Sequence, residues 1–369
     1  MTLLVSAGEG SGDAMAAPVV RELGVAAFGL GGRALAAAGV DLLADLSSLT
    51  GMGVGAVVAR APAIARAAHL LLSEAKSRHA RAALLVGYSD FNAWLAPRLR
   101  SRGVRVLWYA PPQVWAWRPG RAPSLARSVD RMAVVLPFEQ ALWQAHGVDA
   151  SYVGHPAFER AAPPRDAVRQ RLGLAPWAEY VAILPGSRPE EIGRHLEPML
   201  DAVALLRADR GALDARVIVA SSLARTVADR IGRAATAAGV SVVESSAPSV
   251  LSAFDAALAA SGTVTLECVA AEVPPVIGYR VGPLTELVAR RLVSLETIGL
   301  PNLVLGEQVF PELLQGRFSA EALAEEAGRL LDDRATFVRA CRDVRAMVCP
   351  DGATESSKHV ARLLAPWLS

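Results

Sequence analysis

The run ASGTVTLE at 260–267 brings hydroxyl, glycine and carboxylate groups to the expected start of one helix. An apolar stretch precedes it, so the chain is expected to turn from a strand into a helix at Ser261, Gly262 and Thr263. Two hydroxyls and the free N–H groups of a helix start would meet there, which suits a diphosphate. Glu267 lies one helical turn further on the same face, where its carboxylate could accept two ribose hydroxyls. A solvated helix position is the alternative for Glu267.

A second turn, LPGSRPEEI at 184–192, joins another apolar run to a pair of glutamates that could open a helix. Ser187 is expected to cap that helix through its hydroxyl. Arg188 carries a planar guanidinium, which can bind an anion through two parallel hydrogen bonds. The alternative is a capped helix whose arginine lies on the surface without a ligand.

A third turn, AGEGSGD at 7–13, places glycines at positions 8, 10 and 12 before an expected helix. Glycine lets a backbone approach a ligand closely, and the helix start offers unpaired N–H groups. The spacing is not GxGxxG, and no acid about 20 residues further on is placed as a nicotinamide site requires. A nicotinamide-dependent oxidoreductase is therefore disfavoured, and a tight structural turn is the alternative to a ligand-binding loop.

Two further segments could contact sugars or lipids. The run WYAPPQVWAWRPGR at 108–121 contains Trp115 and Trp117 beside arginines, a combination that can bind sugar rings, lipid headgroups or a protein partner. A packed loop is its alternative. In the segment 48–72, small apolar residues surround two arginines, of which Arg66 is one. This segment is either an interfacial helix whose arginines meet anionic headgroups or a core helix whose arginines point to water.

These turns require two consecutive series of strands and helices. Apolar runs without strict alternation predict strands that are buried on both faces, as in a parallel sheet. The first series lies at 3–7, 82–87, 104–110 and 131–138. The second series lies at 179–187, 215–221, 240–245, 255–261 and 274–279. A proline-rich link at 156–176 separates the two series, and the chain is expected to end in helices at 319–347 and 353–368.

The predicted fold class is therefore α/β, with two Rossmann-like, doubly wound parallel-sheet domains that face a central cleft. The expected domains are 1–155 and 156–349, and a C-terminal helix within 350–369 is expected to join the first domain. The second domain then carries the two anion-binding turns.

The composition argues against several classes of protein. The 369 residues contain 38 Lys and Arg against 36 Asp and Glu, and this net charge of +2 disfavours a nucleic-acid binder. The longest stretch without a charged side chain covers 14 residues (46–59), whereas a membrane span needs about 20. The three cysteines form no CxxC and the six histidines do not cluster, so neither a disulfide framework nor a metal site is expected. The start MTLLVSAGEGSGD lacks a basic signal-like region, and a reducing cytoplasm is the expected location.

The motifs as a set resemble those of the lipid-A-disaccharide synthases. They follow that family's order as AGEGSGD, SDFN (89–92), PPQVWAWR (111–118), LPFE (136–139), VGHP (153–156), LPGSR (184–188), ASGTVTLE, VIGYRV (276–281) and LPNLVLGEQVFPELLQ (300–315). The resemblance covers nearly the whole chain, and VWAWR together with LPNLVLGE is its most specific part.

The resemblance implies an inverting glycosyltransferase of the GT-B fold that needs no metal and no other cofactor. Such an enzyme joins UDP-2,3-diacylglucosamine to 2,3-diacylglucosamine 1-phosphate, giving a β(1→6)-linked disaccharide 1-phosphate and UDP, in the biosynthesis of lipid A. It is peripheral to the cytoplasmic face of the inner membrane and binds no nucleic acid. A homodimer is compatible with the resemblance, which does not fix the oligomeric state.

The resemblance also implies roles for individual residues. The UDP site is implied to contain Ser187, Arg188, Ser261, Gly262, Thr263, Glu267 and Asn302, with Tyr279 and Arg280 near it. The substrate-binding candidates of the first domain are Ser11, Asn92, Trp115 and Trp117. Because no metal is implied, Arg188 and the N–H groups of the turn at 261–263 would neutralise the leaving diphosphate.

One departure from the family concerns the catalytic base. The family carries an aspartate, two residues and then Asp-Phe-Asn after a strand, and the first aspartate is its candidate base. The run LLVGYSDFN is interpreted as two residues shorter, so Asp90 matches the second aspartate and the first is absent. A buried carboxylate with a raised pKa, either Asp90 or Glu9, is expected to take over.

Two alternatives to this transferase stay open on the sequence. One is another UDP-sugar enzyme of the same fold, such as an epimerase or a peptidoglycan-type glycosyltransferase, because fold alone does not fix the substrate. The other is a degenerate homologue that binds lipid or nucleotide without catalysis.

Overall fold

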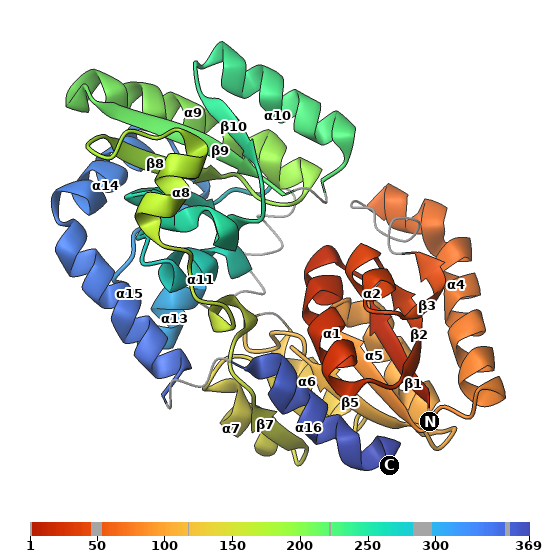
Figure 1. Ribbon diagram of the computed structural model, residues 1–369. Helices are drawn as coiled ribbons and strands as arrows, with labels where there is room; N and C mark the ends of the chain where they lie inside the picture. The colour runs from red at the N-terminus through yellow and green to blue at the C-terminus, as the bar shows by residue number, and fades with distance from the viewer. Residues whose placement is uncertain (1, 46–53, 117, 221–222, 283–296, 351–354) are drawn as a thin grey trace. The chain divides into compact units, whose positions relative to one another are not determined.

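The computed structural model describes residues 2–45, 54–116, 118–220, 223–282, 297–350 and 355–369 (Figure 1). The chain divides into two compact units. Unit 1 consists of Met1–Pro156 with Ala353–Ser369, and unit 2 consists of Ala157–Gly352. Each unit is built around its own parallel sheet, so the predicted α/β fold class is confirmed.

The sheet of unit 1 has seven strands in the order β3-β2-β1-β4-β5-β6-β7, and all neighbours are parallel. The strands are β1 (Thr2–Ala7), β2 (Ala26–Gly31), β3 (Asp41–Asp45), β4 (Ala82–Val86), β5 (Arg105–Tyr109), β6 (Arg131–Val134) and β7 (Asp149–Tyr152). The helices are α1 (Gly10–Leu23), α2 (Arg33–Ala37), α4 (Val54–Ser77), α5 (Ser89–Arg100), α6 (Ala122–Ala126), α7 (Glu139–Gln144) and α16 (Ser356–Leu368).

The sheet of unit 2 has six strands in the order β10-β9-β8-β11-β12-β13, again all parallel. The strands are β8 (Glu179–Leu184), β9 (Leu213–Val219), β10 (Ser241–Glu244), β11 (Ala256–Ala260), β12 (Pro275–Tyr279) and β13 (Glu312–Leu314). The helices are α8 (Arg165–Leu172), α9 (Pro189–Arg210), α10 (Arg225–Ala237), α11 (Thr263–Ala270), α13 (Leu300–Leu305), α14 (Ala320–Asp332) and α15 (Arg334–Val348).

Both sheets have the doubly wound strand order, which determines where ligands bind. In such sheets the direction of winding reverses between two neighbouring strands, and ligands bind beyond the carboxyl ends of that pair. The pair is β1 and β4 in unit 1 and β8 and β11 in unit 2. The turns 7–13 and 87–92 follow the first pair, and the turns 184–192 and 260–267 follow the second. The chain order alone therefore brings the predicted motifs to two switch points.

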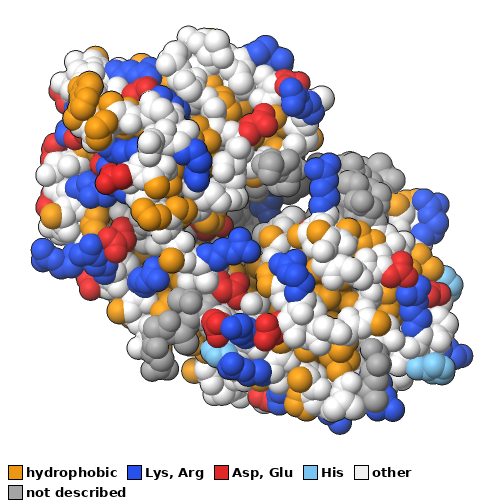
Figure 2. All heavy atoms as spheres, viewed as in Figure 1, with side chains coloured by type: hydrophobic (Ala, Val, Ile, Leu, Met, Phe, Trp, Pro, Cys, Tyr) orange, Lys and Arg blue, Asp and Glu red, His pale blue; other side chains and the backbone are white. Residues whose placement is uncertain are grey.

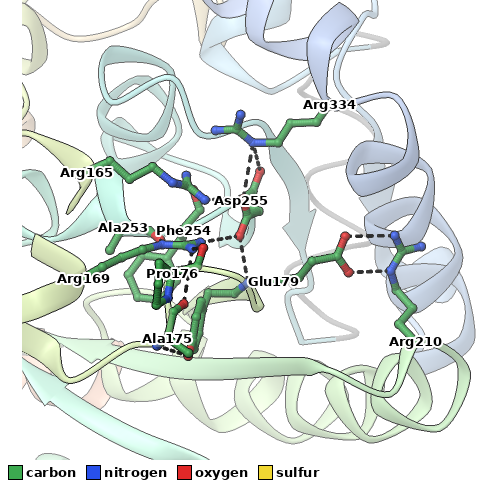
Figure 3. A network of polar contacts seen from close by, with 11 residues as sticks. Arg165, Arg169, Ala175, Pro176, Glu179, Arg210, Ala253, Phe254, Asp255 and Arg334 are labelled. Carbon is green, nitrogen blue, oxygen red and sulfur yellow. Dashed lines mark hydrogen bonds and ion pairs between the residues drawn. The ribbon is translucent and has the colours of Figure 1, made fainter.

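A carboxylate ties helix α8, which lies within the proline-rich link 156–176, to the sheet of unit 2 (Figure 3). Asp255 is only 9% exposed and lies at the amino end of β11. It accepts hydrogen bonds from Arg165, from Arg169 (2.8 Å) and from the backbone N–H of Tyr180 (2.9 Å), and Arg334 lies 3.6 Å away. Since this edge of the sheet is opposite to the switch point, the network holds the fold together and leaves the site to other residues.

Helix α4 packs along the core of unit 1. Ala67, Ala68 and Leu71 are buried in that core, while Arg66 is exposed. One face of the segment therefore packs in the core, the exposed Arg66 is compatible with both interpretations of 48–72, and 48–53 lie outside the described residues. Among the residues that the structure describes, none forms a helix with the length and apolar character needed to cross a bilayer. Figure 2 shows acidic and basic side chains interspersed on the visible face of unit 2, as expected from the small net charge.

Candidate functional site

The switch point of unit 1 presents the turn that follows β1. Glu9 is the N-cap residue of α1 and is half-buried, and Ser11 in the first turn of the helix is exposed. Both side chains therefore lie at the edge of the sheet where a ligand of this fold binds. Glu9 provides the carboxylate of this turn, and Ser11 provides a hydroxyl.

The other acid of this turn, Asp13, has a structural role that the sequence did not reveal. It is buried, and its carboxylate accepts hydrogen bonds from the backbone N–H groups of Gly32 (2.7 Å), Ala34 (2.8 Å) and Leu35 (3.1 Å). These groups lie at the start of α2, where the first N–H groups of a helix lack partners within the helix. Asp13 therefore joins α1 to the start of α2 and is not available to a substrate.

Tyr88 forms a strained turn directly after β4. Its φ is 47°, and that of the preceding Gly87 is 56°, so both lie in the left-handed region. The ring lies against Gly8, where an added Cβ would come within 2.0 Å of it, and stacks on Phe91 with 5.0 Å between ring centroids. Burial, and after it the charge of Glu9, raises the pKa of the Tyr88 phenol. Strained non-glycine backbone of this kind is typical of functional sites.

Asp90 is not the buried carboxylate that the sequence led us to expect. It lies in the first turn of α5, its side chain is 83% exposed, and its Oδ1 pairs with Arg121 at 2.8 Å. A residue this close to a helix start points outward because the helix packs its other face on the sheet. The family pattern also corrects the interpretation of a shortened run. Counting back three residues from Asp90 gives Gly87, so a glycine occupies the place of the first aspartate and no residue is missing.

Asn92 was predicted to bind substrate, but its side chain is fully buried. Its Oδ1 accepts a hydrogen bond from the Ser6 hydroxyl (2.7 Å), and its Nδ2 donates to the Gly87 carbonyl (2.8 Å). Asn92 thus connects the end of β1 to the turn after β4. Its amide is occupied by the ends of the two strands that carry Glu9 and Tyr88, and a direct contact with substrate stays a prediction.

The aromatic loop after β5 is held by an acid from a distant motif. The indole Nε1 of Trp115 donates to Glu139 at 3.0 Å, and its ring meets the edge of Phe138 at 5.1 Å between centroids. Glu139 is buried, and burial raises its pKa against the opposing effect of these hydrogen bonds. Trp115 remains partly exposed, whereas Trp117 lies outside the described residues. Only the acid at the end of the LPFE motif could have indicated this link.

In unit 2, the turn after β8 puts Arg188, and not the predicted Ser187, at the N-cap position of the following helix. Helix α9 begins at Pro189, and Arg188 is its N-cap residue, with no hydrogen bond from a capping side chain. The predicted cap by Ser187 is therefore wrong, because proline is well suited to the first helical position and the helix starting at Pro189 puts Arg188, not Ser187, at the N-cap. Ser187 and Arg188 are both exposed at the switch point.

Glu191 gathers the polar side chains of this turn. Its Oε1 accepts hydrogen bonds from Arg188 Nη1 (3.1 Å) and from the Tyr279 hydroxyl (3.4 Å) at the end of β12. Burial first, and then the charge of Glu191, raises the pKa of the Tyr279 phenol, which keeps it a donor. Arg280, the next residue, is exposed. The predicted pair of Tyr279 and Arg280 therefore does lie beside the turn that carries Arg188.

The turn after β11 has the geometry of an anion-binding site. Gly262 is the N-cap residue of α11 with φ 156°, and an added Cβ there would meet no atom within 4 Å, so the space in front of the turn is open. Thr263, the first helical residue, is exposed. Ser261 donates its hydroxyl to the Ile298 carbonyl at 3.3 Å. The start of α11 therefore faces open space, and of its first N–H groups that of Thr265 already donates to the Gly262 carbonyl (3.1 Å).

Glu267 lies one turn into α11, and its pKa is raised to about 7 by burial. Loss of water raises the pKa because it destabilises the charged carboxylate. Hydroxyl donors from a ligand would stabilise that charged form again. Glu267 is only partly exposed, so the solvated alternative is disfavoured and its contact with a ribose stays a prediction.

Asn302 was predicted to line the nucleotide site, but the structure assigns its side chain to a loop. The residue is 1% exposed. Its Nδ2 donates to the Phe310 carbonyl (2.8 Å) and to Glu312 (2.7 Å), and its Oδ1 accepts from the N–H groups of Val309 (3.0 Å) and Phe310 (2.9 Å). Its amide oxygen and nitrogen both have partners within the protein, so Asn302 shapes the loop before β13, and its place in the nucleotide site stays a prediction.

Within the part of the chain that the structure describes, no group of three or more His, Cys, Asp or Glu side chains could hold a metal ion. Positive charge for an anionic ligand in unit 2 is instead available from Arg188 and Arg280 and from the start of α11.

Comparison with known sequences gives one consistent result. The family model described as Lipid-A-disaccharide synthetase matches residues 3–359. The lipid-A-disaccharide synthase of Anaeromyxobacter dehalogenans (strain 2CP-1 / ATCC BAA-258) is 42% identical over 360 residues, which cover 95% of this chain and 94% of that protein. The enzyme of the same name from Myxococcus xanthus is 39% identical over 377 residues and covers 99% of this chain and 98% of its own length.

Comparison with solved structures shows a shared fold. A UDP-GlcNAc 2-epimerase from Neisseria meningitidis bound to UDP-GlcNAc superposes with a TM-score of 0.69 at 12% identity, over 99% of this chain and 100% of that chain. A UDP-GlcNAc 2-epimerase from Methanocaldococcus jannaschii gives a TM-score of 0.60 at 10% identity, over 99% and 100%. At such low identity the likeness extends to the fold and not to the reaction.

Proposed function

This chain belongs to the lipid-A-disaccharide synthase family and is a hexosyltransferase, and we propose that it joins UDP-2,3-diacylglucosamine to 2,3-diacylglucosamine 1-phosphate with inversion at the anomeric carbon. The observation that carries the proposal is the match over residues 3–359, which includes the switch points of both units. Epimerization is no longer an alternative, because the epimerases resemble this chain in fold alone.

The donor nucleotide is proposed to bind at the switch point of unit 2. The diphosphate would receive hydrogen bonds from the start of α11 and from Arg188, and Glu267 would accept the ribose hydroxyls. When the anomeric carbon–oxygen bond breaks, the electron pair and the negative charge go to UDP. Arg188 would stabilise that charge as it develops, which is how fixed cations and N–H groups lower the barrier of group transfer.

The acceptor is proposed to meet its base in unit 1. The 6-hydroxyl forms the new bond to the anomeric carbon and gives its proton to a carboxylate, for which Glu9 is the better candidate. Glu9 is half-buried beside the strained Tyr88, whereas Asp90 is exposed and already paired with Arg121. Asn92 would act indirectly, by holding together the two strand ends that carry Glu9 and Tyr88. Ser11 and Trp115 are proposed to contact the acceptor sugar.

An assay of UDP release tests the proposal. The protein is incubated with UDP-2,3-diacylglucosamine, with and without 2,3-diacylglucosamine 1-phosphate, and UDP and disaccharide are quantified. UDP release that requires the acceptor, in equal amount with disaccharide, is the expected result. Binding of UDP without turnover would instead support a degenerate homologue, an alternative that the glycine at position 87 keeps relevant.

Association with the inner-membrane surface from the cytoplasmic side is also proposed. Its support is the basic, apolar segment 48–72, whose Arg66 is exposed on α4. Flotation with vesicles of anionic phospholipid is expected to recover the protein, and Arg66→Glu is expected to reduce that recovery, whereas Arg225→Glu on α10 is not. Equal recovery of both variants would contradict the assignment of the membrane-facing segment.

Sedimentation of the purified protein tests the homodimer that the family resemblance allows.

A further inference from the structure

His195 is a buried histidine that joins the backbones of two turns at the switch point of unit 2. It lies in α9 and has no exposed surface. Its Nδ1 is 3.0 Å from the carbonyl oxygen of Pro185, in the turn after β8. Its Nε2 is 2.9 Å from the backbone N of Arg280, directly after β12. A single side chain therefore connects the turn that carries Arg188 to the backbone of Arg280.

Nε2 also lies 3.2 Å from the Arg280 carbonyl oxygen, but its shorter contact, 2.9 Å from the Arg280 N–H, selects one form of the imidazole. The Pro185 carbonyl can only accept, so Nδ1 must carry the proton, and the Arg280 N–H can only donate, so Nε2 must be bare. This is the neutral tautomer with its hydrogen on Nδ1. The rings of Tyr279 and Phe318 pack around it, with centroids 5.5 Å and 5.2 Å away. These contacts fix the orientation of the imidazole.

The groups around His195 favour its neutral state. Burial lowers its pKa, the Pro185 and Arg280 backbone groups and the carboxylate of Glu191 oppose this, and the charge of Arg194 adds to it. Protonation would place a hydrogen on Nε2 and exchange the 2.9 Å hydrogen bond from the Arg280 N–H for a longer one, at 3.2 Å, to the Arg280 carbonyl.

Glu191 and His195 together form a clasp, by which we mean these two residues only. They are four positions apart on α9 and therefore lie on one face, one turn above the other. Glu191 joins the side chains of Arg188 and Tyr279, and His195 joins the backbones beside them. Both arginine side chains are exposed, and the backbones that His195 joins determine where each of them leaves its turn.

We infer that His195 is a positioning residue for the donor site: as a neutral imidazole it holds the turns of Arg188 and Arg280 in register so that both guanidiniums face the same nucleoside diphosphate. The inference rests on the proposed function, because it takes UDP as the ligand of this switch point. It adds a residue that does not contact the ligand and that none of the sequence motifs contains.

UDP binding to His195→Leu, His195→Gln and Met199→Ala tests the inference, measured by titration calorimetry below the melting temperature of each protein. His195→Leu removes both hydrogen bonds. It should weaken UDP binding about tenfold, which corresponds to the free energy of about one buried hydrogen bond. His195→Gln keeps an amide that can accept from the Arg280 N–H, and it should recover part of the affinity. Met199 is the matched control, because it is fully buried one turn further along α9 and lies outside the clasp.

The steady-state constants separate positioning from general damage. His195→Leu is expected to raise KM for the UDP-sugar while leaving KM for the acceptor unchanged. Met199→Ala is expected to lower the melting temperature and leave both constants unchanged. Unaltered UDP affinity in His195→Leu would overturn the inference, and so would an equal loss of affinity in Met199→Ala. If the unsubstituted protein does not bind UDP, the proposed function fails first, and that result is distinct from either of these.

Discussion

Arg188 is proposed to stabilise the leaving group, because it is an exposed cationic side chain on the turn after β8. Replacing Arg188 by Ala is expected to lower kcat by about 10²–10³, as for removal of one fixed donor at a developing negative charge. The fold should remain intact, since the side chain is 46% exposed. Arg225→Ala on α10 is the control, because that guanidinium is 84% exposed and pairs only within its helix. Rates of UDP release that match between the two variants would contradict the assignment.

Glu9 is the residue that we propose accepts the proton of the acceptor hydroxyl. Glu9→Gln keeps the shape of the side chain but cannot take a proton, so kcat should fall by about 10²–10⁴. Asp90→Asn should retain most of the activity, because its exposed carboxylate is committed to Arg121. Single-turnover rates of disaccharide formation measure both. A large loss in Asp90→Asn with normal turnover in Glu9→Gln would move the proton acceptor to α5.

Glu267 gives the donor site a pH dependence. Its pKa of about 7 means that the carboxylate is mostly charged at pH 8 and mostly protonated at pH 6. A charged carboxylate accepts hydroxyl donors more strongly, so UDP affinity should fall as the pH is lowered through 7. The affinity ratio of the unsubstituted protein to Glu267→Gln should drop from about ten at pH 8 toward one at pH 6. Because UDP itself titrates equally in both measurements, its own titration cancels in this affinity ratio. A ratio that stays constant with pH would argue against contact between Glu267 and the ribose.

At the scale of elements, the sequence predicted most strands of both sheets but missed β2 and three of the edge strands. The runs predicted at 82–87 and 255–261 are confirmed as β4 and β11, because central parallel strands are apolar throughout. The sheet-edge strands β3, β7 and β13 have short or acid-flanked sequences, since an edge strand buries less of its surface. In β2, Gly29 interrupts the apolar run by which the other strands were predicted. An added Cβ there would come within 1.9 Å of the Val5 carbonyl, so this glycine is required for the pairing with β1.

The motifs located the site better than they assigned roles within it. Glycine-rich turns were correctly placed after strands, because the order of the strands fixes where such turns lie. Whether an amide faces a ligand or the protein depends on packing that the motif does not encode. Asn92 and Asn302 therefore turned out to be buried supports. His195 was missed for the same reason, since its partners are backbone groups distant in the sequence.

The network around Asp255 leads to a prediction about element stability. Removing this carboxylate leaves Arg169, whose side chain is 5% exposed, as a buried charge without its partner. Asp255→Ala should lower the free energy of unfolding of unit 2 by about 3–5 kcal/mol. Asp332→Ala is the matched control, because that aspartate pairs with Arg210 at a position 68% exposed, and it should change stability by less than about 1 kcal/mol. Urea unfolding, followed by hydrogen exchange in α8 and β8, measures both. Similar losses would show that the network is no more than a surface ion pair.

At the scale of the whole molecule, the end of the chain completes the unit in which the chain begins. Helix α16 packs on α1, its Leu364 is fully buried, and the hydroxyls of Tyr109 and Ser356 lie 3.1 Å apart. Unit 1 can therefore reach its final stability only after the entire unit 2 has been made. Leu364→Ala should destabilise unit 1 by about 2–5 kcal/mol through the cavity that it leaves.

The effect of Leu364→Ala should be confined to one unit, because α16 belongs to unit 1 by its internal contacts. Hydrogen exchange should accelerate in β1, β4 and α1, while exchange in β8, β11 and α9 stays as in the unsubstituted protein. Leu205→Ala is the control, since that leucine is 44% exposed on α9 and its loss should change stability by less than about 0.5 kcal/mol. Equal acceleration in both units would mean that they unfold as one cooperative body. In that case the acceptor and donor halves could not be tuned independently by substitution.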